Sequence, residues 1–516
     1  MPPAPSEPGA SDLGRALFFQ SIGAVGFAYG RAHLIVPARP PTLSQRMRQG
    51  IEDLRLTMTR RIQAALPGSI GGIASALITG ERGGITEEDE EALRDAGLAH
   101  VLAIAGLHMA LMGGGIFWLL RAMLAAVPAQ ALRYPIKKWA AVGALAASAF
   151  YLLISGAAPS AVRAFVMLAM VMAAILLDRP ALSMRSLALA AAILLVMRPE
   201  TIVEPGFQMS FAAVAGLVAV AEWERQRERT APRGAFYRYA HGIVMTSLVG
   251  SLATLPFAMF HFDRATHYAV LGNLIAMPVM GFWVMPAAAL LVALMPLGLE
   301  GLALHLLGQG IAVMLAMGRW VSGLPGAVSL APAMPLSALL MISLGGLWLT
   351  IWRRTLRWLG LAPLVLGGVL AWAAPVPDML VASDAVTIAI RGDDGRLAFM
   401  RRPKDRFIAH DWLRRDGDGR DIADAVGLPG LKCDGLGCVV KAKHLIAASL
   451  RPEALADDCE RAAVLVSAVT ANCKGPAVMI DQNVAARGEG WRITLSPKPT
   501  AISVRELRGE RPWVAD

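Results

Sequence analysis

The chain has 516 residues, of which 55% are hydrophobic and 17% are charged, and its formal net charge is +10. A soluble domain usually carries about 25% charged residues, so the composition excludes a chain built only from soluble domains. In a membrane protein, an excess of basic residues chiefly marks the cytoplasmic side. The second interpretation of the basic excess is that the chain binds an anionic ligand.

Residues 1–40 contain one apolar stretch, from Leu17 to Tyr29. No basic segment precedes it, so we do not expect a secretory signal peptide. The stretch is also short for a membrane span. We therefore expect a strand or an interfacial element in this region.

Residues 41–97 contain two predicted helices. Over residues 43–65, apolar residues recur at helical spacing and arginines fall mostly elsewhere, which indicates an amphipathic helix lying on the membrane or on the protein body. The apolar positions are Leu43, Met47, Ile51, Leu54, Met58, Ile62 and Ala65, and the arginines are Arg46, Arg48, Arg55, Arg60 and Arg61. Further along, Thr86 begins a run of acids that ends near residue 96. A capping hydroxyl followed by carboxylates predicts a helix N-terminus there.

Residues 98–374 form a succession of apolar runs, which predicts an α-helical membrane region with about ten spans. The expected spans are 98–127, 138–157, 160–177, 185–198, 207–221, 240–260, 268–296, 300–323, 335–352 and 356–374. Two of these, 185–198 and 207–221, are short. Broken or re-entrant helices of this kind often line a translocation path.

Basic residues cluster in four of the loops between these spans. The clusters are Arg133, Lys137 and Lys138; Arg179 and Arg185; Arg225, Arg227, Arg229, Arg233 and Arg238; and Arg353, Arg354 and Arg357. With the expected spans, all four lie on one side, which should be cytoplasmic. The acidic segment 86–95 and everything after residue 375 would then face the periplasm, on the other side of an inner membrane.

Residues 378–516 read as a soluble mixed α/β domain. Alternating stretches at 386–390 and 463–467 predict strands, and the sequence at 392–396 (GDDGR) predicts a turn between two strands. The expected fold is thus a polytopic α-helical membrane protein with a C-terminal periplasmic α/β domain.

All four cysteines, Cys433, Cys438, Cys459 and Cys473, lie in this C-terminal region. In an oxidising periplasm they would form two disulfides, with three possible pairings. A zinc site is the alternative, although the spacing does not match a zinc ribbon.

Four polar residues in or beside the spans are candidates for a transport path: Arg163, His100, His108 and Gln208. A guanidinium in an otherwise uncharged span needs water, an acid or a phosphate, or else it reaches the membrane interface. Residues eight apart on one helix lie within about 80° of each other, so His100 and His108 either line a path or bond to neighbouring helices. Gln208 follows Pro205 and either lines a break or caps the helix.

Three blocks of sequence resemble the ComEC family of competence proteins. They are residues 77–113 (LITGERGGITEEDEEALRDAGLAHVLAIAGLHMALMG), 159–167 (PSAVRAFVM) and 204–211 (EPGFQMSF), the last following Arg198–Pro199. The blocks occur in the family's order, and with the flanking spans the resemblance covers roughly residues 70–350. The family commonly has Ser where this chain has Ala105, which puts a polar role for that hydroxyl in doubt.

The resemblance implies an inner-membrane channel that imports single-stranded DNA during natural transformation. It also implies that residues 1–40 are a remnant of the family's N-terminal OB-like region, and that residues 378–516 resemble its metallo-β-lactamase-like domain. The H-x-H-x-D-H metal motif is missing, and only His410 and His444 follow residue 375. We expect a degenerate domain with no metal and no cofactor.

The sequence offers no motor and no catalytic motif. There is no Gly-Lys dipeptide and hence no Walker A motif, and G-x-S-x-G and H-E-x-x-H are absent. We therefore expect a non-enzyme that works with a cytoplasmic ATPase and a periplasmic DNA-receptor protein. The basic loop at 225–238 either contacts the emerging strand or only signals topology. A small-molecule permease, which should show an internal repeat, and a non-transporting membrane scaffold are the alternatives.

Overall fold

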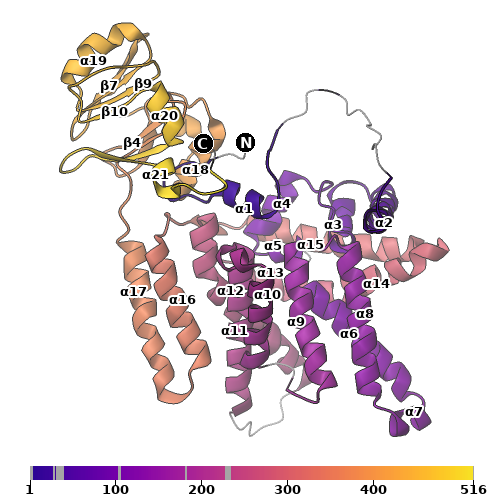
Figure 1. Cartoon of the computed structure of the whole chain (residues 1–516). Coiled ribbons are helices and arrows are strands. Elements are labelled where there is room, and N and C mark those ends of the chain that lie inside the picture. The colour runs from indigo at the N-terminus through magenta and orange to yellow at the C-terminus, as the bar shows by residue number, and fades with distance from the viewer. Residues whose placement is uncertain are drawn as a thin grey trace.

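The computed structural model describes residues 4–26, 30, 40–102, 106–180, 183–226 and 234–514. A bundle of long helices carries a C-terminal α/β domain at one of its ends, and shorter helices lie between the two (Figure 1). The fold class predicted from the sequence is confirmed.

Eight helices in the described part of the chain are long and apolar enough to cross a membrane. They are α6 (Gly106–Ala125), α8 (Ile136–Ile154), α9 (Pro159–Leu176), α11 (Pro205–Gln226), α12 (Ala235–Phe262), the continuous run of α13 (Ala269–Val279), η2 (Met280–Val284), α14 (Met285–Leu294) and η3 (Met295–Leu297), α15 (Gly301–Ser322), and η4 (Arg354–Gly360) with α17 (Leu361–Trp372). The helices α10 (Met184–Met197) and α16 (Leu336–Ile351) are shorter.

Each of the ten expected spans therefore corresponds to a helix, but one length prediction is wrong. The span at 185–198 is short, as predicted, since α10 has 14 residues. The span at 207–221 is not short, because α11 has 22 residues. The apolar run ends before Glu222 and Glu224, but the helix continues through them to Gln226.

The basic clusters gather at the end of the bundle far from the C-terminal domain. The short helix α7 (Pro128–Arg133) and the α16–α17 connection lie at that end (Figure 1). Lys138 at the start of α8 pairs with Asp178 beyond the end of α9, at 2.6 Å. Arg353 beyond α16 pairs with Glu222 near the end of α11, at 2.9 Å. Arg227, Arg229 and Arg233 lie outside the described residues.

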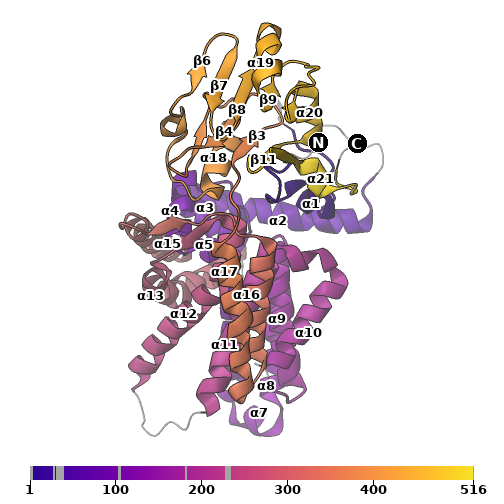
Figure 2. The ribbon, with the colours of Figure 1, turned by 90° about the vertical axis from the view of Figure 1, so that its left-hand side faces the viewer.

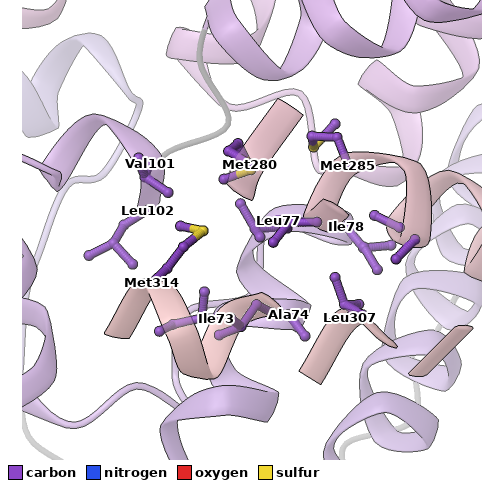
Figure 3. Packing of buried hydrophobic residues seen from close by; sticks show 14 of the residues in the cluster. Ile73, Ala74, Leu77, Ile78, Val101, Leu102, Met280, Met285, Leu307 and Met314 are labelled. Atoms are coloured by element: carbon purple, nitrogen blue, oxygen red, sulfur yellow. The ribbon is translucent and has the colours of Figure 1, made fainter. Parts of the chain in front are cut away.

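Helix α15 runs across the direction of α8 and α9, at the end of the bundle that carries the C-terminal domain (Figure 1). Protein covers much of its surface, and two glycines allow the close contacts: a Cβ on Gly308 would lie 2.7 Å from Leu66, and one on Gly318 would lie 2.6 Å from Leu93. Figure 3 shows the resulting core, where Met314 of α15 and Met280 of η2 lie near Leu77 and Leu102.

The helices before the bundle are α2 (Leu43–Ala65), α3 (Gly68–Ile78), α4 (Glu87–Asp95) and α5 (Ala99–Leu102). Helix α2 lies across the bundle beneath the C-terminal domain (Figure 2). Thr42 and Gln45 form its capping box, and the Thr86 hydroxyl accepts a bond from Asp89 N at the start of α4. The prediction of helices at 43–65 and from Thr86 is confirmed.

The N-terminal segment is attached to the C-terminal domain. Residues Leu13–Phe19 form a helix, α1, and the described part of the stretch Leu17–Tyr29 contains no strand, so of the two alternatives the strand is wrong there. Phe18 and Phe19 pack on Trp513, with ring centroids 5.8 Å apart in each case. The buried Glu7 carboxylate pairs with Arg415 and Arg492.

The C-terminal domain is a sandwich of two five-stranded sheets. The first has the order β12 (Thr500–Ser503), β11 (Trp491–Thr494), β3 (Met379–Val381), β4 (Ile388–Arg391), β5 (Leu397–Phe399). The second has the order β10 (Val478–Ile480), β9 (Val464–Ser467), β8 (Leu445–Ser449), β7 (Gly437–Lys441), β6 (Lys432–Cys433). Val381, Ile390, Val440 and Val466 share the core between the sheets.

Helices cover the outer faces of this sandwich. Trp412 of α18 (Arg406–Arg415) stacks on Phe399 of the first sheet, and α19 (Leu455–Arg461) packs on the second. The predicted GDDGR turn joins β4 to β5, which pair antiparallel. Other elements include the strands β1 (Arg264–Thr266) and β2 (Val328–Leu330) and the helices α20 (Gln482–Gly488) and α21 (Val504–Arg508).

Candidate functional site

Arg163 lies in the second turn of α9, whose first residue is Pro159. The side chain is buried at the junction with α11, at the bundle end that carries the C-terminal domain. A Cβ on Gly206 would lie 2.4 Å from its Nη2 atom, so the guanidinium occupies the space that this glycine leaves open. Nη1 lies 3.9 Å from the Glu204 carboxylate, which is an ion-pair contact but too long for a hydrogen bond.

The Arg163 guanidinium has a hydrogen-bond donor that is not used. Its Nε–H is buried and has no acceptor among the described residues. A guanidinium offers five N–H donors in a fixed plane, a geometry that matches carboxylate and phosphate oxygens. The site therefore combines a cation that cannot lose its charge with donors that an incoming anion could use.

Gln208 links three elements at the same junction. Its Nε2 donates to the carbonyl of Ile202 at 3.0 Å, in the short helix η1 (Pro199–Val203). Its Oε1 lies 2.8 Å from Nε2 of His261, near the end of α12. These two contacts give Gln208 a bridging position between η1, α11 and α12, which differs from both roles considered from the sequence.

The two histidine candidates lie in different environments. His100, on α5, is exposed, and its Nδ1 lies 3.1 Å from the carbonyl of Gly97. His108, on α6, is fully buried. Residues 103–105, including Ala105, lie outside the described residues, so the structure does not place the two histidines on one described helix.

Asp263 joins the bundle to the C-terminal domain. It follows α12 in the left-handed conformation, with φ 53°, and is 1% exposed. Its carboxylate lies 3.7 Å from Nε of Arg414 in α18, and Ala333 N donates to the Arg415 carbonyl at 2.8 Å. Burial raises the pKa of the Asp263 carboxyl to about 6, although Arg415 and Arg414 act to lower it.

The remaining predicted site residues lie far from this junction. Arg225 and Arg238 are exposed at the opposite end of the bundle. The four cysteines form two disulfides, Cys433–Cys438 and Cys459–Cys473. No group of three or more His, Cys, Asp or Glu side chains in the described ranges is arranged to hold a metal ion.

Sequence reasoning missed Glu204, Gly206, His261 and Asp263. The first two belong to the block EPGFQMSF that carried the family resemblance, so their position in a motif could have marked them. His261 and Asp263 gave no such signal, because their partners lie 53 and 151 residues away in the chain.

The chain is similar to known competence proteins. A family model described as "Competence protein" matches residues 77–356. The chain is 27% identical over 246 residues to ComE operon protein 3 of Bacillus subtilis. This alignment covers 48% of this chain and 29% of that protein. It is 30% identical over 230 residues to competence protein ComA of Neisseria gonorrhoeae, and this alignment covers 44% of this chain and 30% of that protein.

A third relative is the uncharacterized protein YcaI of Escherichia coli, 27% identical over 250 residues, which covers 48% of this chain and 32% of that protein. The chain thus aligns with less than a third of the length of each of these relatives. No solved structure matches it. Because the family model covers more than half of the 516 residues and contains the three motif blocks, this protein belongs to the ComEC family of competence proteins.

Proposed function

We propose that this protein conducts single-stranded DNA across the bacterial inner membrane during natural transformation. Family membership supports a role in competence and DNA uptake. The more specific proposal, that the protein conducts single-stranded DNA, rests on Arg163. This residue is a buried cation at a junction of three helices, and it has an unused N–H donor. A DNA phosphate is an anion of the right geometry for it.

The proposed direction of transport follows from the charge distribution. Basic residues favour the cytoplasmic side, so the end that carries Arg133, Arg225 and Arg353 would face the cytoplasm. The C-terminal domain and the junction around Arg163 would then face the periplasm, where DNA arrives. The exposed Arg225 and Arg238 would meet the strand as it emerges, through contacts with its phosphates.

In this proposal the protein is a conduit and not a catalyst. The energy for movement would come from a cytoplasmic ATPase, since the sequence has no Walker A motif. A periplasmic DNA-receptor protein would deliver the strand. Arg163 would provide weak, transient contacts, because tight binding of each phosphate would slow passage.

Complementation in a naturally competent host tests this function. A strain lacking its own channel gene would carry the wild-type chain, Arg163→Ala or Arg198→Ala, and would receive marked DNA. Arg198 is the matched control, since it lies at the same end of the bundle but pairs with Glu200 at 2.8 Å. We expect wild type and Arg198→Ala to restore transformation and Arg163→Ala to abolish it at equal membrane levels.

Two results would count against the proposal. Normal transformation by Arg163→Ala would remove Arg163 from the path. Failure of the wild-type chain, when it is present in the membrane and a longer relative succeeds in the same strain, would favour a non-transporting scaffold. Labelled DNA that becomes protected from added nuclease but does not reach the cytoplasm would place the block at the inner membrane.

A further inference from the structure

A cavity of about 440 Å³ lies between α6, α9, α10 and α11. On α9 its lining runs from Ala164 to Ile175, a rise of about 16 Å along the helix. It ends at Ser183 and Ser186, at the start of α10. The cavity therefore extends from just below Arg163 toward the basic end of the bundle.

The lining is apolar, and this limits what can occupy the cavity. Half of the described lining residues are methionine, leucine, valine or isoleucine, and none of the described lining residues is charged. Water needs two to four polar partners at such a site, and the two serines offer few. A DNA phosphate would lose its hydration without gaining a cation, so the cavity does not suit the transported strand.

The cavity is accessible from the lipid side of the bundle. Trp118, which lines it, is 63% exposed. The other lining residues of α6 include Gly106, Ala110 and Gly114, whose small side chains leave the space open. A flexible apolar chain from the bilayer can therefore enter between the helices without displacing them.

We propose that this cavity holds one acyl chain of an anionic phospholipid from the leaflet at the basic end. The length fits, since half of a bilayer's hydrocarbon core is about 15 Å thick. The charge also fits, because Arg179 and Arg185 are exposed beside the serine end, where the headgroup would lie. This inference does not depend on DNA conduction.

Two neighbouring glycines provide a matched pair of variants. A Cβ on Gly114 or on Gly115 would meet no atom within 4 Å, so a larger side chain fits at either position. Only Gly114 lines the cavity. Gly114→Leu should fill the space that the acyl chain occupies, whereas Gly115→Leu should leave it open.

The experiment uses the full chain in nanodiscs that contain phosphatidylglycerol with a diazirine in its acyl chain. After illumination, mass spectrometry locates the labelled peptides. We expect labelling of the α9 segment 164–175 in wild type and in Gly115→Leu, and its loss in Gly114→Leu. A second set of nanodiscs contains phosphatidylcholine with the same diazirine, and there we expect weaker labelling in the wild type.

Thermal unfolding of each variant establishes that Gly114→Leu is folded. Should that variant fail to fold, Ala110→Leu replaces it, since Ala110 also lines the cavity. Equal labelling of segment 164–175 in both glycine variants would overturn the proposal. Equal labelling by the two lipids would overturn the part that concerns an anionic headgroup.

Discussion

Gly206 and Arg163 occupy complementary positions: the guanidinium lies where a side chain on residue 206 would have to be, with Nη2 2.4 Å from the position of a Cβ. The beginning of α11 and the second turn of α9 are thereby held in one arrangement. Any residue larger than glycine at position 206 must displace the arginine or separate the helices.

Gly206→Ala should therefore reproduce much of the effect of Arg163→Ala. We expect a large loss of transformation and a destabilisation of about 1–3 kcal/mol, which is typical of overpacking. Transformation frequency and thermal unfolding measure the two effects. Gly250→Ala is the control, since a Cβ there meets no atom within 4 Å. Normal transformation by Gly206→Ala would show that the position of the guanidinium is unimportant.

The raised pKa of Asp263 predicts a dependence of stability on pH. Because its folded-state pKa is about 6, above the ordinary 3.8, the folded protein binds a proton more readily than the unfolded chain. Stability should therefore rise as the pH falls from about 7 to about 4, by up to roughly 3 kcal/mol from this group. Asp263→Asn should lose this part of the pH dependence.

The measurement is the midpoint of thermal unfolding between pH 4 and pH 8 for both proteins. Titrating groups away from Asp263 contribute equally to the two curves, so the difference between the curves reports Asp263 and the charged groups beside it. Parallel curves across this range would mean that the Asp263 carboxyl titrates near its ordinary pKa.

The two disulfides should contribute unequally to stability. Cys459–Cys473 closes a separation of 14 residues and Cys433–Cys438 one of 5. In the loop-entropy model these correspond to about 3 and about 2 kcal/mol. Denaturant unfolding of the two double Cys→Ser variants tests the order. Peptide mapping without reductant tests the pairing, and either alternative pairing would contradict it.

Tyr151 fixes α3 to α8 through a single buried bond, in which its hydroxyl donates to the carbonyl of Leu77 at 2.6 Å. Tyr151→Phe leaves that carbonyl without this donor, and we expect a loss of about 1–3 kcal/mol. Tyr134→Phe is the control, since Tyr134 is 52% exposed. Equal unfolding midpoints for the two variants would show that this bond contributes little.

The sequence predicted features that depend on neighbouring residues. The helix start at Thr86 was recognisable because the cap and its partner lie within three residues. The turn between β4 and β5 was recognisable for the same reason. Apolar runs of spanning length located the helices of the bundle, since hydropathy is summed over a local window.

Features that depend on distant partners were not predictable in this way. The stretch from Leu17 to Tyr29 was expected to be a strand or an interfacial element, but its first three residues belong to α1, which Asp12 caps and on which Trp513, near the other end of the chain, packs. The crosswise direction of α15 depends on contacts with Leu66 and Leu93, which no hydropathy window includes. The contact between Asp263 and Arg414 was not predictable for the same reason, since the two residues lie 151 positions apart in the chain.

The attachment of Glu7 to Arg415 and Arg492 restricts how the chain can pass through a membrane. Two segments that touch must lie on the same face of the bilayer, so the number of crossings between them is even. An insertion or deletion that adds or removes a single crossing would leave Glu7 and Arg415 on opposite sides. Each such change must therefore be matched by a second one before the two ends of the chain can meet.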